Sequence, residues 1–125
     1  MKKNRCAARL NPSWFDLEYQ ASLARRGAYI EFDMFGINHF YPPDRASPDE
    51  IGPLKTVAEH IEAELIDRLL LSQDVYLKMM FRKFGGLGYV HLFTNLAPYF
   101  QQVEITQNQL DTIFIENPRH LLPFI

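Results

Sequence analysis

The amino-acid sequence predicts an α/β fold whose strands are parallel. Segments with helical periodicity alternate with short strands in the order helix, strand, helix, strand, helix, helix. One of these strands contains three consecutive leucines, Leu69–Leu71, which is typical of a strand buried on both faces of a parallel sheet. Such alternation favours parallel strands joined by crossover helices.

The first helix is expected over residues 14–26 and leads into a strand. Ser13 is the expected N-cap, with Asp16 three residues later, and Gly27 is a typical residue to end the helix. The following strand, residues 28–33, has two alternating faces, which are Ala28, Ile30 and Phe32 on one side and Tyr29, Glu31 and Asp33 on the other. Two carboxylates on one face of a covered sheet require partners or a polar cavity.

A long loop, residues 34–46, separates this strand from the second helix. Its aromatic side chains either belong to a functional lid or pack back on the body of the domain. Ser47 and Glu50 form the start signal of the next helix, and Gly52-Pro53 is expected to restart or kink its first turn. His60 lies between solvent-facing neighbours on this helix, so we expect it at the surface.

The second strand, residues 69–74, ends in a carboxylate. In parallel α/β folds chemistry collects at the carboxyl ends of the strands, which is where Asp74 stands. An aspartate at this position either takes part in chemistry or caps the following turn, and the strand alone does not separate the two.

The chain after Asp74 is irregular and then helical. Residues 85–88 contain three glycines without the spacing of a nucleotide-binding loop, so a flexible turn is expected. A helix from Tyr89 is expected to bury Leu92, Phe93, Leu96 and Phe100. Thr106 begins a further helix, which Asn117-Pro118 is expected to end.

Composition bounds the class of protein. A chain of 125 residues is one domain, and a formal net charge of -2 gives no overall basic field for nucleic acid or acidic membranes. The single cysteine, Cys6, fits a reducing compartment, and no apolar run has the length of a membrane span. We therefore expect a cytoplasmic protein that binds neither nucleic acid nor membrane.

Few residues show a pattern that supports catalysis. The four histidines, at 39, 60, 91 and 120, lack the spacing of a zinc site. Ser72 has no nucleophile-elbow context. What remains is Asp74, with Glu31 and Asp33 on the earlier strand, as carboxylates suited to metal binding or general-base chemistry.

Several blocks in order resemble the carboxyl-terminal part of the phosphotriesterase family, in particular its phosphotriesterase-related branch in the amidohydrolase superfamily. These blocks are 11–13, 27–36, 67–74, 85–89 and 115–119. The resemblance implies a (β/α)8 barrel whose two metal ions, usually zinc, activate a hydroxide that hydrolyses phosphotriesters, lactones or related esters. By this resemblance Asp74 is the metal ligand of the eighth strand and accepts a proton from the attacking water.

The same resemblance suggests where substrate would bind. The loop 34–46 would follow the seventh strand, and residues 76–84 would line the pocket from the loop after the eighth. Candidates for the substrate pocket are Met34, Phe35, Phe40, Tyr41 and Tyr76.

The chain also departs from the family pattern in length and in its metal ligands. A full barrel needs about 250 residues, and this chain holds the equivalents of strands seven and eight with a trace of strand six. The partial barrel domain is expected at 11–125, after a poorly patterned segment at 1–10. Arg9 stands where the family has a histidine ligand and cannot replace it, because a guanidinium has no acceptor nitrogen. The family's His-x-His and lysine ligands are absent.

Two hypotheses follow. The first is a truncated or split metal-dependent hydrolase, inactive alone and unable to bind the two metal ions stoichiometrically. The alternative is a non-catalytic α/β module that associates with a partner chain or with itself through its strand edges and aromatic loop.

Overall fold

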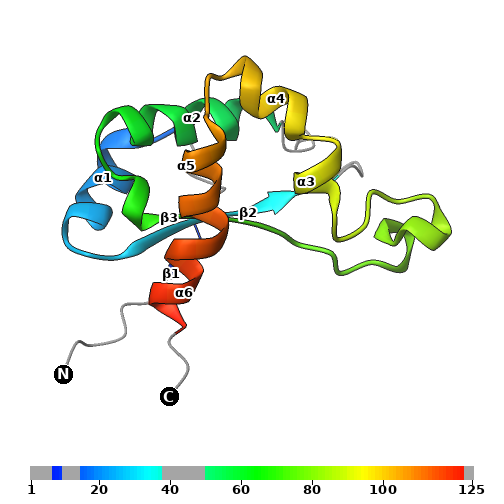
Figure 1. The fold of residues 1–125 in the computed structure, drawn as a ribbon. Coiled ribbons are helices and arrows are strands. Elements are labelled where there is room, and N and C mark those ends of the chain that lie inside the picture. Colours follow the sequence, from blue (N-terminus) through cyan, green and yellow to red (C-terminus); the bar gives the residue numbers. More distant parts are fainter. Residues whose placement is uncertain (1–6, 10–14, 38–49, 123–125) are drawn as a thin grey trace.

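The computed structural model describes residues 7–9, 15–37 and 50–122. Within these ranges three strands, β1 (Ala7–Arg9), β2 (Tyr29–Phe35) and β3 (Leu69–Gln73), form one parallel sheet in the order β1-β2-β3 (Figure 1). Ile30 lies in register with Ala8 on one side and Leu69 on the other. The predicted parallel α/β arrangement is therefore confirmed.

The core lies between one face of this sheet and the helices. Alternate residues of the strands, Ile30, Phe32, Leu69 and Leu71, pack with Ala24 of α1 (Leu17–Arg25) and with Leu54 and Val57 of α2 (Ile51–Glu62). Figure 1 shows α1 and α2 together on one side of the strands. The period of two along each strand therefore directs the leucine-rich surface of the sheet toward the helices.

Strand β1 lies in the segment 1–10, which the sequence shows as poorly patterned. Ala7, Ala8 and Arg9 pair with Tyr29, Ile30 and Glu31. The segment lacks an apolar run, but it extends the sheet through backbone hydrogen bonds, which do not depend on side-chain pattern.

Helix α1 begins later than predicted. Asp16 is its N-cap, and its carboxylate accepts a hydrogen bond from the backbone N–H of Tyr19 at 3.1 Å. The predicted N-cap, Ser13, lies outside the described residues. Gly27, with φ +91°, follows the helix as predicted and turns the chain into β2.

Strand β2 is longer than predicted and contains an irregularity. Its register with β3 shifts between Phe32 and Phe35, so that Phe35 joins the core although a strict alternation would place Met34 there. The expectation that the loop begins at Met34 is therefore wrong, because both residues belong to the strand.

Helix α2 starts at Ile51, with Glu50 preceding it. Pro53 therefore lies in the first turn, where its missing N–H has no helical partner to lose. The expected surface position of His60 is wrong: its side chain is buried against α1, and its Nε2 donates a hydrogen bond to Gln20 Oε1 at 2.7 Å.

Short helical turns lie before and after β3. The 3-10 turns η2 (Ile66–Arg68), η3 (Lys78–Met80) and η4 (Arg82–Phe84) surround that strand and the segment after it. The single helix expected from Tyr89 is instead two, α3 (His91–Thr94) and α4 (Ala97–Gln102), with Pro98 in the first turn of the second. Phe93 was expected to be buried but is 61% exposed, because the break at Asn95 and Leu96 changes which residues face the core.

The carboxyl-terminal helix continues past Asn117-Pro118, contrary to expectation. It consists of α5 (Gln107–Asp111), a π-helical turn η5 (Thr112–Glu116) and α6 (Asn117–Leu121). Pro118 is the second residue of α6 and follows directly after the π-helical turn. The capping box predicted at Thr106 is present, with the Gln109 side chain accepting from the Thr106 N–H at 2.8 Å.

None of the helices in the described ranges combines the length and the apolar composition that crossing a bilayer requires.

Candidate functional site at the carboxyl ends of the strands

Asp74 follows the last residue of β3 directly and is partly buried. Because β2 and β3 are parallel, their carboxyl ends lie at the same edge of the sheet. Phe35 of β2 is in register with Gln73 of β3, so Asp74 and the segment after Phe35 leave the sheet side by side. This edge is where parallel α/β folds bind ligands.

The two carboxylates of β2, Glu31 and Asp33, lie within the folded structure. Glu31 Oε1 accepts a hydrogen bond from Ser72 Oγ at 2.9 Å, which ties the two strands together. Asp33 is buried, with 7% of its surface exposed. Arg9 ends β1 and is in backbone register with Glu31.

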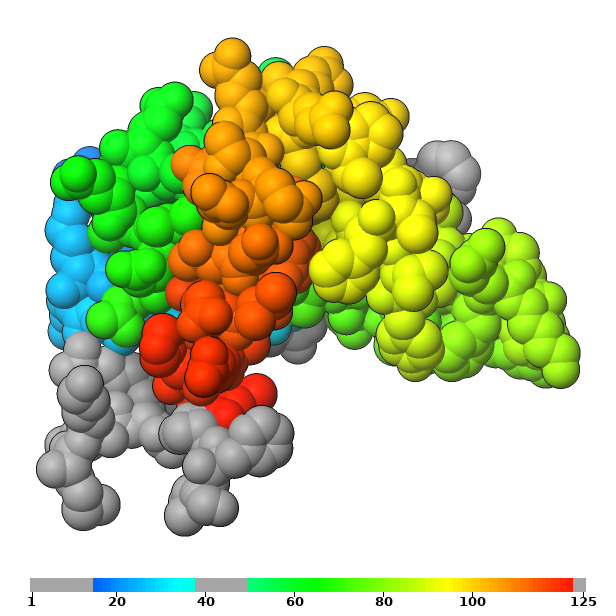
Figure 2. Space-filling view, viewed as in Figure 1, coloured from blue at the N-terminus to red at the C-terminus, as the bar shows by residue number. Residues whose placement is uncertain are grey.

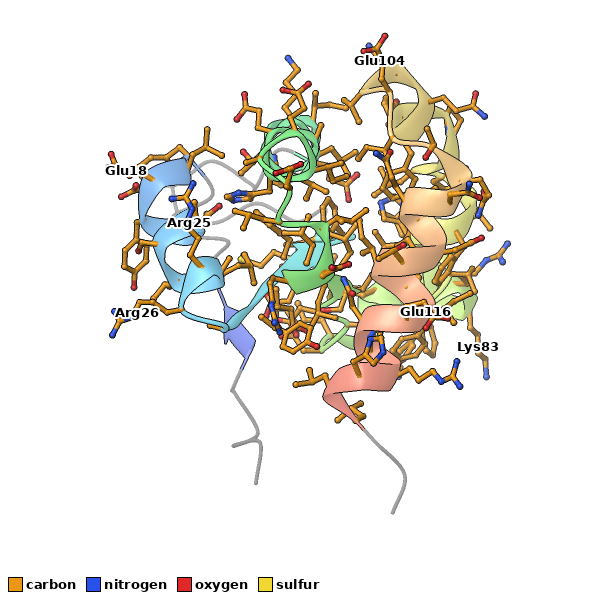
Figure 3. All side chains as sticks on the ribbon, turned by 60° about the vertical axis from the view of Figure 1, so that its left-hand side comes forward. Glu18, Arg25, Arg26, Lys83, Glu104 and Glu116 are labelled. Atoms are coloured by element: carbon orange, nitrogen blue, oxygen red, sulfur yellow. The ribbon has the colours of Figure 1, made fainter. Side chains whose placement is uncertain are left out.

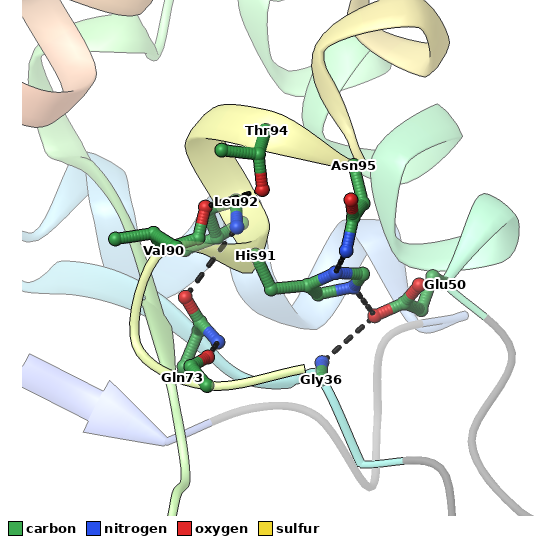
Figure 4. A network of polar contacts seen from close by, with 9 residues as sticks. Gly36, Glu50, Gln73, Val90, His91, Leu92, Thr94 and Asn95 are labelled. Atoms are coloured by element: carbon green, nitrogen blue, oxygen red, sulfur yellow. Dashed lines mark hydrogen bonds and ion pairs between the residues drawn. The ribbon is translucent and has the colours of Figure 1, made fainter. Parts of the chain in front are cut away.

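Glu50 connects three elements near this edge (Figure 4). Its Oε1 accepts hydrogen bonds from the backbone N–H of Gly36 and from His91 Nε2, each at 2.7 Å. The other ring nitrogen of His91, Nδ1, accepts from Asn95 Nδ2 at 3.0 Å. The buried imidazole therefore has both nitrogens engaged, with its hydrogen on Nε2.

Gln73, the residue before Asp74, holds the chain that follows β3. Its Nε2 donates to the Gly88 carbonyl at 2.6 Å, and its Oε1 accepts from the Leu92 N–H at 3.4 Å (Figure 4). A Cβ on Gly36 would lie 3.0 Å from Gln73 Nε2, so the ends of β2 and β3 touch here. The network consequently fixes where Asp74 leaves the sheet.

Sequence reasoning missed Glu50, Gln73 and His91 as parts of this site. Glu50 reads as a helix-start residue and Gln73 as an ordinary strand residue. The one usable signal is that Gln73 precedes a strand-end carboxylate. The partnership of Glu50 with His91 spans 41 residues and leaves no local pattern.

The expected substrate-pocket residues have diverse environments. Met34 is partly buried, Phe35 is buried in the core with 1% of its surface exposed, and Tyr76 is exposed. Phe40 and Tyr41 lie outside the described residues. The structure therefore does not gather these residues into one pocket within the ranges it describes.

The described side chains do not form a metal centre. In 7–9, 15–37 and 50–122 no three or more His, Cys, Asp or Glu side chains gather where they could hold a metal ion. Asp74 is thus a single candidate ligand, and the two-metal set implied by the resemblance does not fit the described residues alone.

A separate cavity of about 410 Å³ lies among α3, α4, α5 and η5. Its lining is mainly apolar, includes Phe93, Phe100 and Phe114, and does not include Asp74. The rings of Phe93 and Phe114 pack at a tilt of 55°, with centroids 4.8 Å apart.

Comparison with known proteins places the chain in context. A model of the phosphotriesterase family matches residues 7–122. The N-acetyltaurine hydrolase of Homo sapiens is 35% identical over 118 residues, which are 92% of this chain and 34% of that protein. The phosphotriesterase-related protein of Drosophila mojavensis is 30% identical over 127 residues, 98% of this chain and 36% of that protein. The chain spans about a third of the length of the curated relatives it matches.

Solved structures also resemble this chain over about a third of their own length. A crystal structure of a resiniferatoxin-binding protein from Rhodobacter sphaeroides superposes with a TM-score of 0.86 at 34% identity, covering 94% of this chain and 33% of that one. The phosphotriesterase homology protein from Escherichia coli, solved with phosphate in its active site, gives 0.70 at 27% identity, covering 83% of this chain and 33% of that one.

Proposed function

This chain belongs to the phosphotriesterase family, and we propose that it is the carboxyl-terminal part of a metal-dependent hydrolase, inactive without the rest of the barrel. The observation that carries the proposal is the position of Asp74 at the carboxyl end of a parallel strand. In this proposal β2 and β3 are the seventh and eighth strands of a (β/α)8 barrel, and β1 is the sixth.

The proposed reaction is the addition of water to a phosphotriester, a lactone or a related ester, with cleavage of the ester bond. Similarity to proteins named N-acetyltaurine hydrolase adds an amide to the substrate classes worth testing. Zinc or another divalent ion would make the water nucleophilic at neutral pH. Asp74 would bind the metal centre and accept the proton of the attacking water.

The network around Gln73 and Glu50 would have a positioning role in this reaction. Gln73 fixes the direction in which the chain leaves β3, and therefore the placement of the Asp74 carboxylate. Glu50 holds the end of β2 to α3 through Gly36 and His91. Since the family's His-x-His and lysine ligands are absent from this sequence, further polypeptide would have to supply them.

The test is complementation. The purified chain is assayed for bound zinc and for hydrolysis of paraoxon, a lactone and N-acetyltaurine, first alone and then mixed with the amino-terminal two thirds of a family member. We expect no turnover and no stoichiometric binding of two zinc ions by the chain alone, and turnover with the complementing part.

Two substitutions separate the role of Asp74 from general effects. Asp74→Asn should lower the reconstituted turnover by at least about 100-fold, since it removes a charged ligand at the reacting centre. Asp67→Asn is the matched control, because Asp67 is an exposed carboxylate before the amino end of the same strand. Turnover by the chain alone would contradict the proposed inactivity, and equal effects of the two substitutions would contradict the role of Asp74.

The alternative proposal, a non-catalytic module, is supported by the absence of a metal-binding group among the described side chains. In that case β1 or β3, the outer strands of the described sheet, would pair with another chain. A stable dimer in light-scattering chromatography, without turnover in any complementation mixture, would favour this alternative.

We also propose a cytoplasmic location, supported by the single cysteine.

A further inference from the structure

Residues 76–84, which are expected to line the substrate pocket, belong to a segment that leaves the sheet at the carboxyl end of β3 and returns at α3. We call residues 76–84 the pocket wall. Figure 2 shows this part of the chain in yellow-green as a distinct part of the surface. Figure 3 shows its Lys83 on the opposite side of the molecule from Arg26, which directly follows α1. The position of the wall therefore depends on contacts other than those with α1.

One side chain, that of Gln73, joins the two ends of this segment. Gln73 is the last residue of β3, and its Nε2 donates a hydrogen bond to the Gly88 carbonyl at 2.6 Å. Its Oε1 accepts from the Leu92 N–H at 3.4 Å (Figure 4). Leu92 is the second residue of α3, where a backbone N–H has no partner within its own helix. The amide of Gln73 therefore closes the segment onto the strand from which it starts.

The two partners of this side chain require an amide. Gly88 offers a carbonyl, which can only accept, and Leu92 offers an N–H, which can only donate. Glutamine carries a donor and an acceptor on one planar group and so satisfies both. A glutamate of the same shape would still accept from Leu92, but it would place a carboxylate oxygen against the Gly88 carbonyl. The group is also confined on the side of β2, because a Cβ on Gly36 would lie 3.0 Å from Gln73 Nε2.

Gly88 connects this attachment to the pocket wall. Its N–H donates to the Met80 carbonyl at 2.9 Å, so this buried residue bonds Gln73 through one backbone group and the wall through the other. Its φ is +71°, and a Cβ there would lie 2.6 Å from Cγ of Arg82, so glycine permits the close approach. Met80 is itself buried, with 2% of its surface exposed. The wall is thus held to the end of β3 through Gln73, Gly88 and Met80 in turn.

We propose that Gln73 determines substrate specificity in the proposed hydrolase by fixing the pocket wall before substrate binds. This inference rests on the proposed function and gives Gln73 a role beyond the placement of Asp74. A wall that is already ordered loses little conformational entropy when substrate binds, and it does not move to accept a group of the wrong shape. Because the wall contains Tyr76, Met79 and Phe81, the part of the substrate that it would contact is an apolar substituent.

The experiment compares two lactones that share the reacting ring, γ-butyrolactone and γ-decalactone, of which the second adds a hexyl chain. The intact chain is mixed with the amino-terminal two thirds of a family member, and kcat/KM is measured for both lactones. In Gln73→Glu the ratio of kcat/KM for γ-decalactone to that for γ-butyrolactone should fall by at least about ten-fold, mainly through KM, because only the hexyl chain needs the ordered wall. The ratio cancels any effect of the substitution on Asp74 that the two lactones share.

A second substitution moves the wall without changing Gln73. Gly88→Ala places its Cβ against Arg82 and should lower the ratio in the same direction. Its matched control is Gly85→Ala, at φ +89°, where a Cβ meets nothing within 4 Å. Gln101→Glu, at an exposed position of α4, controls for the added negative charge. Neither control should alter the ratio.

Hydrogen exchange of the chain by itself gives a readout that does not depend on turnover. Gln73→Glu should speed the exchange of backbone amides in residues 76–92 relative to wild type, because the bond that closes the segment is lost. The amides of β2 should exchange as in wild type. If the only role of Gln73 were to support Asp74, exchange in the wall would not change.

The results separate this inference from the proposed function. It is supported by a lower ratio in Gln73→Glu and Gly88→Ala, faster exchange of the wall in Gln73→Glu, and an unchanged ratio in both controls. It is overturned if an active mixture containing Gln73→Glu keeps the wild-type ratio, if the controls lower the ratio equally, or if the wall exchanges as in wild type. A wild-type mixture without turnover would overturn the proposed function and this inference together.

Discussion

Glu50 Oε1 accepts a hydrogen bond from His91 Nε2 at 2.7 Å, across 41 residues of sequence. The same oxygen accepts from the Gly36 N–H at 2.7 Å, so one carboxylate joins the end of β2, the start of α2 and the helix α3. This junction adjoins the carboxyl ends of the strands. Its contribution should be measurable as a change in the free energy of unfolding when Glu50 is replaced.

Glu50→Ala should lower the free energy of unfolding by about 1–3 kcal/mol, because it leaves a buried imidazole N–H and the Gly36 N–H without their acceptor. The measurement is urea denaturation of the isolated chain. Glu59→Ala, at an exposed position of the same helix, is the control and should change stability by less than about 0.5 kcal/mol. Similar losses in both variants would mean that the junction contributes nothing specific.

A pair of glycine substitutions tests the contact between the strand ends. Gly36 and Gly85 have similar backbone angles, φ +83° and +89°, but a Cβ at Gly36 meets Gln73 Nε2 at 3.0 Å whereas one at Gly85 meets nothing within 4 Å. Gly85→Ala should cost about 1 kcal/mol from backbone strain alone. Gly36→Ala should cost more, since Gln73 must also move. If both changes cost the same in urea denaturation, Gln73 is not held against Gly36 as described.

Asn117 provides the third test. Its Nδ2 donates to the carbonyls of Ile66 and Leu69 at 2.7 and 2.8 Å, which ties α6 to the start of β3. Asn117→Ala should lower the free energy of unfolding by about 2–3 kcal/mol, because two carbonyls lose a buried donor. Asn108→Ala, at an exposed position in α5, should be neutral or slightly stabilising, since alanine favours helices. If Asn117→Ala changes the free energy of unfolding no more than Asn108→Ala does, the side chain of Asn117 does not anchor the helix.

The sequence predicts the parts of the fold that depend on local pattern. The parallel pairing of β2 with β3 follows from alternation and from Leu69–Leu71, and the Thr106 capping box follows from residue spacing. Strand β1 escapes prediction because backbone pairing with β2, rather than side-chain pattern, defines it.

Long-range contacts account for the remaining differences. His60 reads as a surface residue because Glu59 and Glu62 flank it, but Gln20 of α1 supplies a buried acceptor 40 residues away. Asn117-Pro118 predicts a helix end because proline usually ends a helix, whereas here a π-helical turn precedes the pair and the helix continues. For the site, the strand-end position of Asp74 is predictable, whereas the contacts of Glu50 and His91 are not.

The buried His60 should make stability depend on pH. Burial, and secondarily the Arg25 guanidinium, lower the pKa of this imidazole below its ordinary value of 6.5. Between the lowered pKa and about 6.5 the unfolded chain binds a proton that the folded chain does not, so stability falls as the pH decreases through this window. Above about pH 6.5 the contribution is complete.

The measurement is the free energy of unfolding of wild type and His60→Gln at several pH values from about 8 down to about 5. The advantage of wild type over His60→Gln should be constant at the upper end. Below about pH 6.5 it should shrink, by at most about 1.4 kcal/mol per pH unit. His120→Gln, at an exposed position of α6, should keep the acid-dependent loss because His60 is still present. A difference between wild type and His60→Gln that does not vary with pH would show that His60 titrates alike in the folded and unfolded chain.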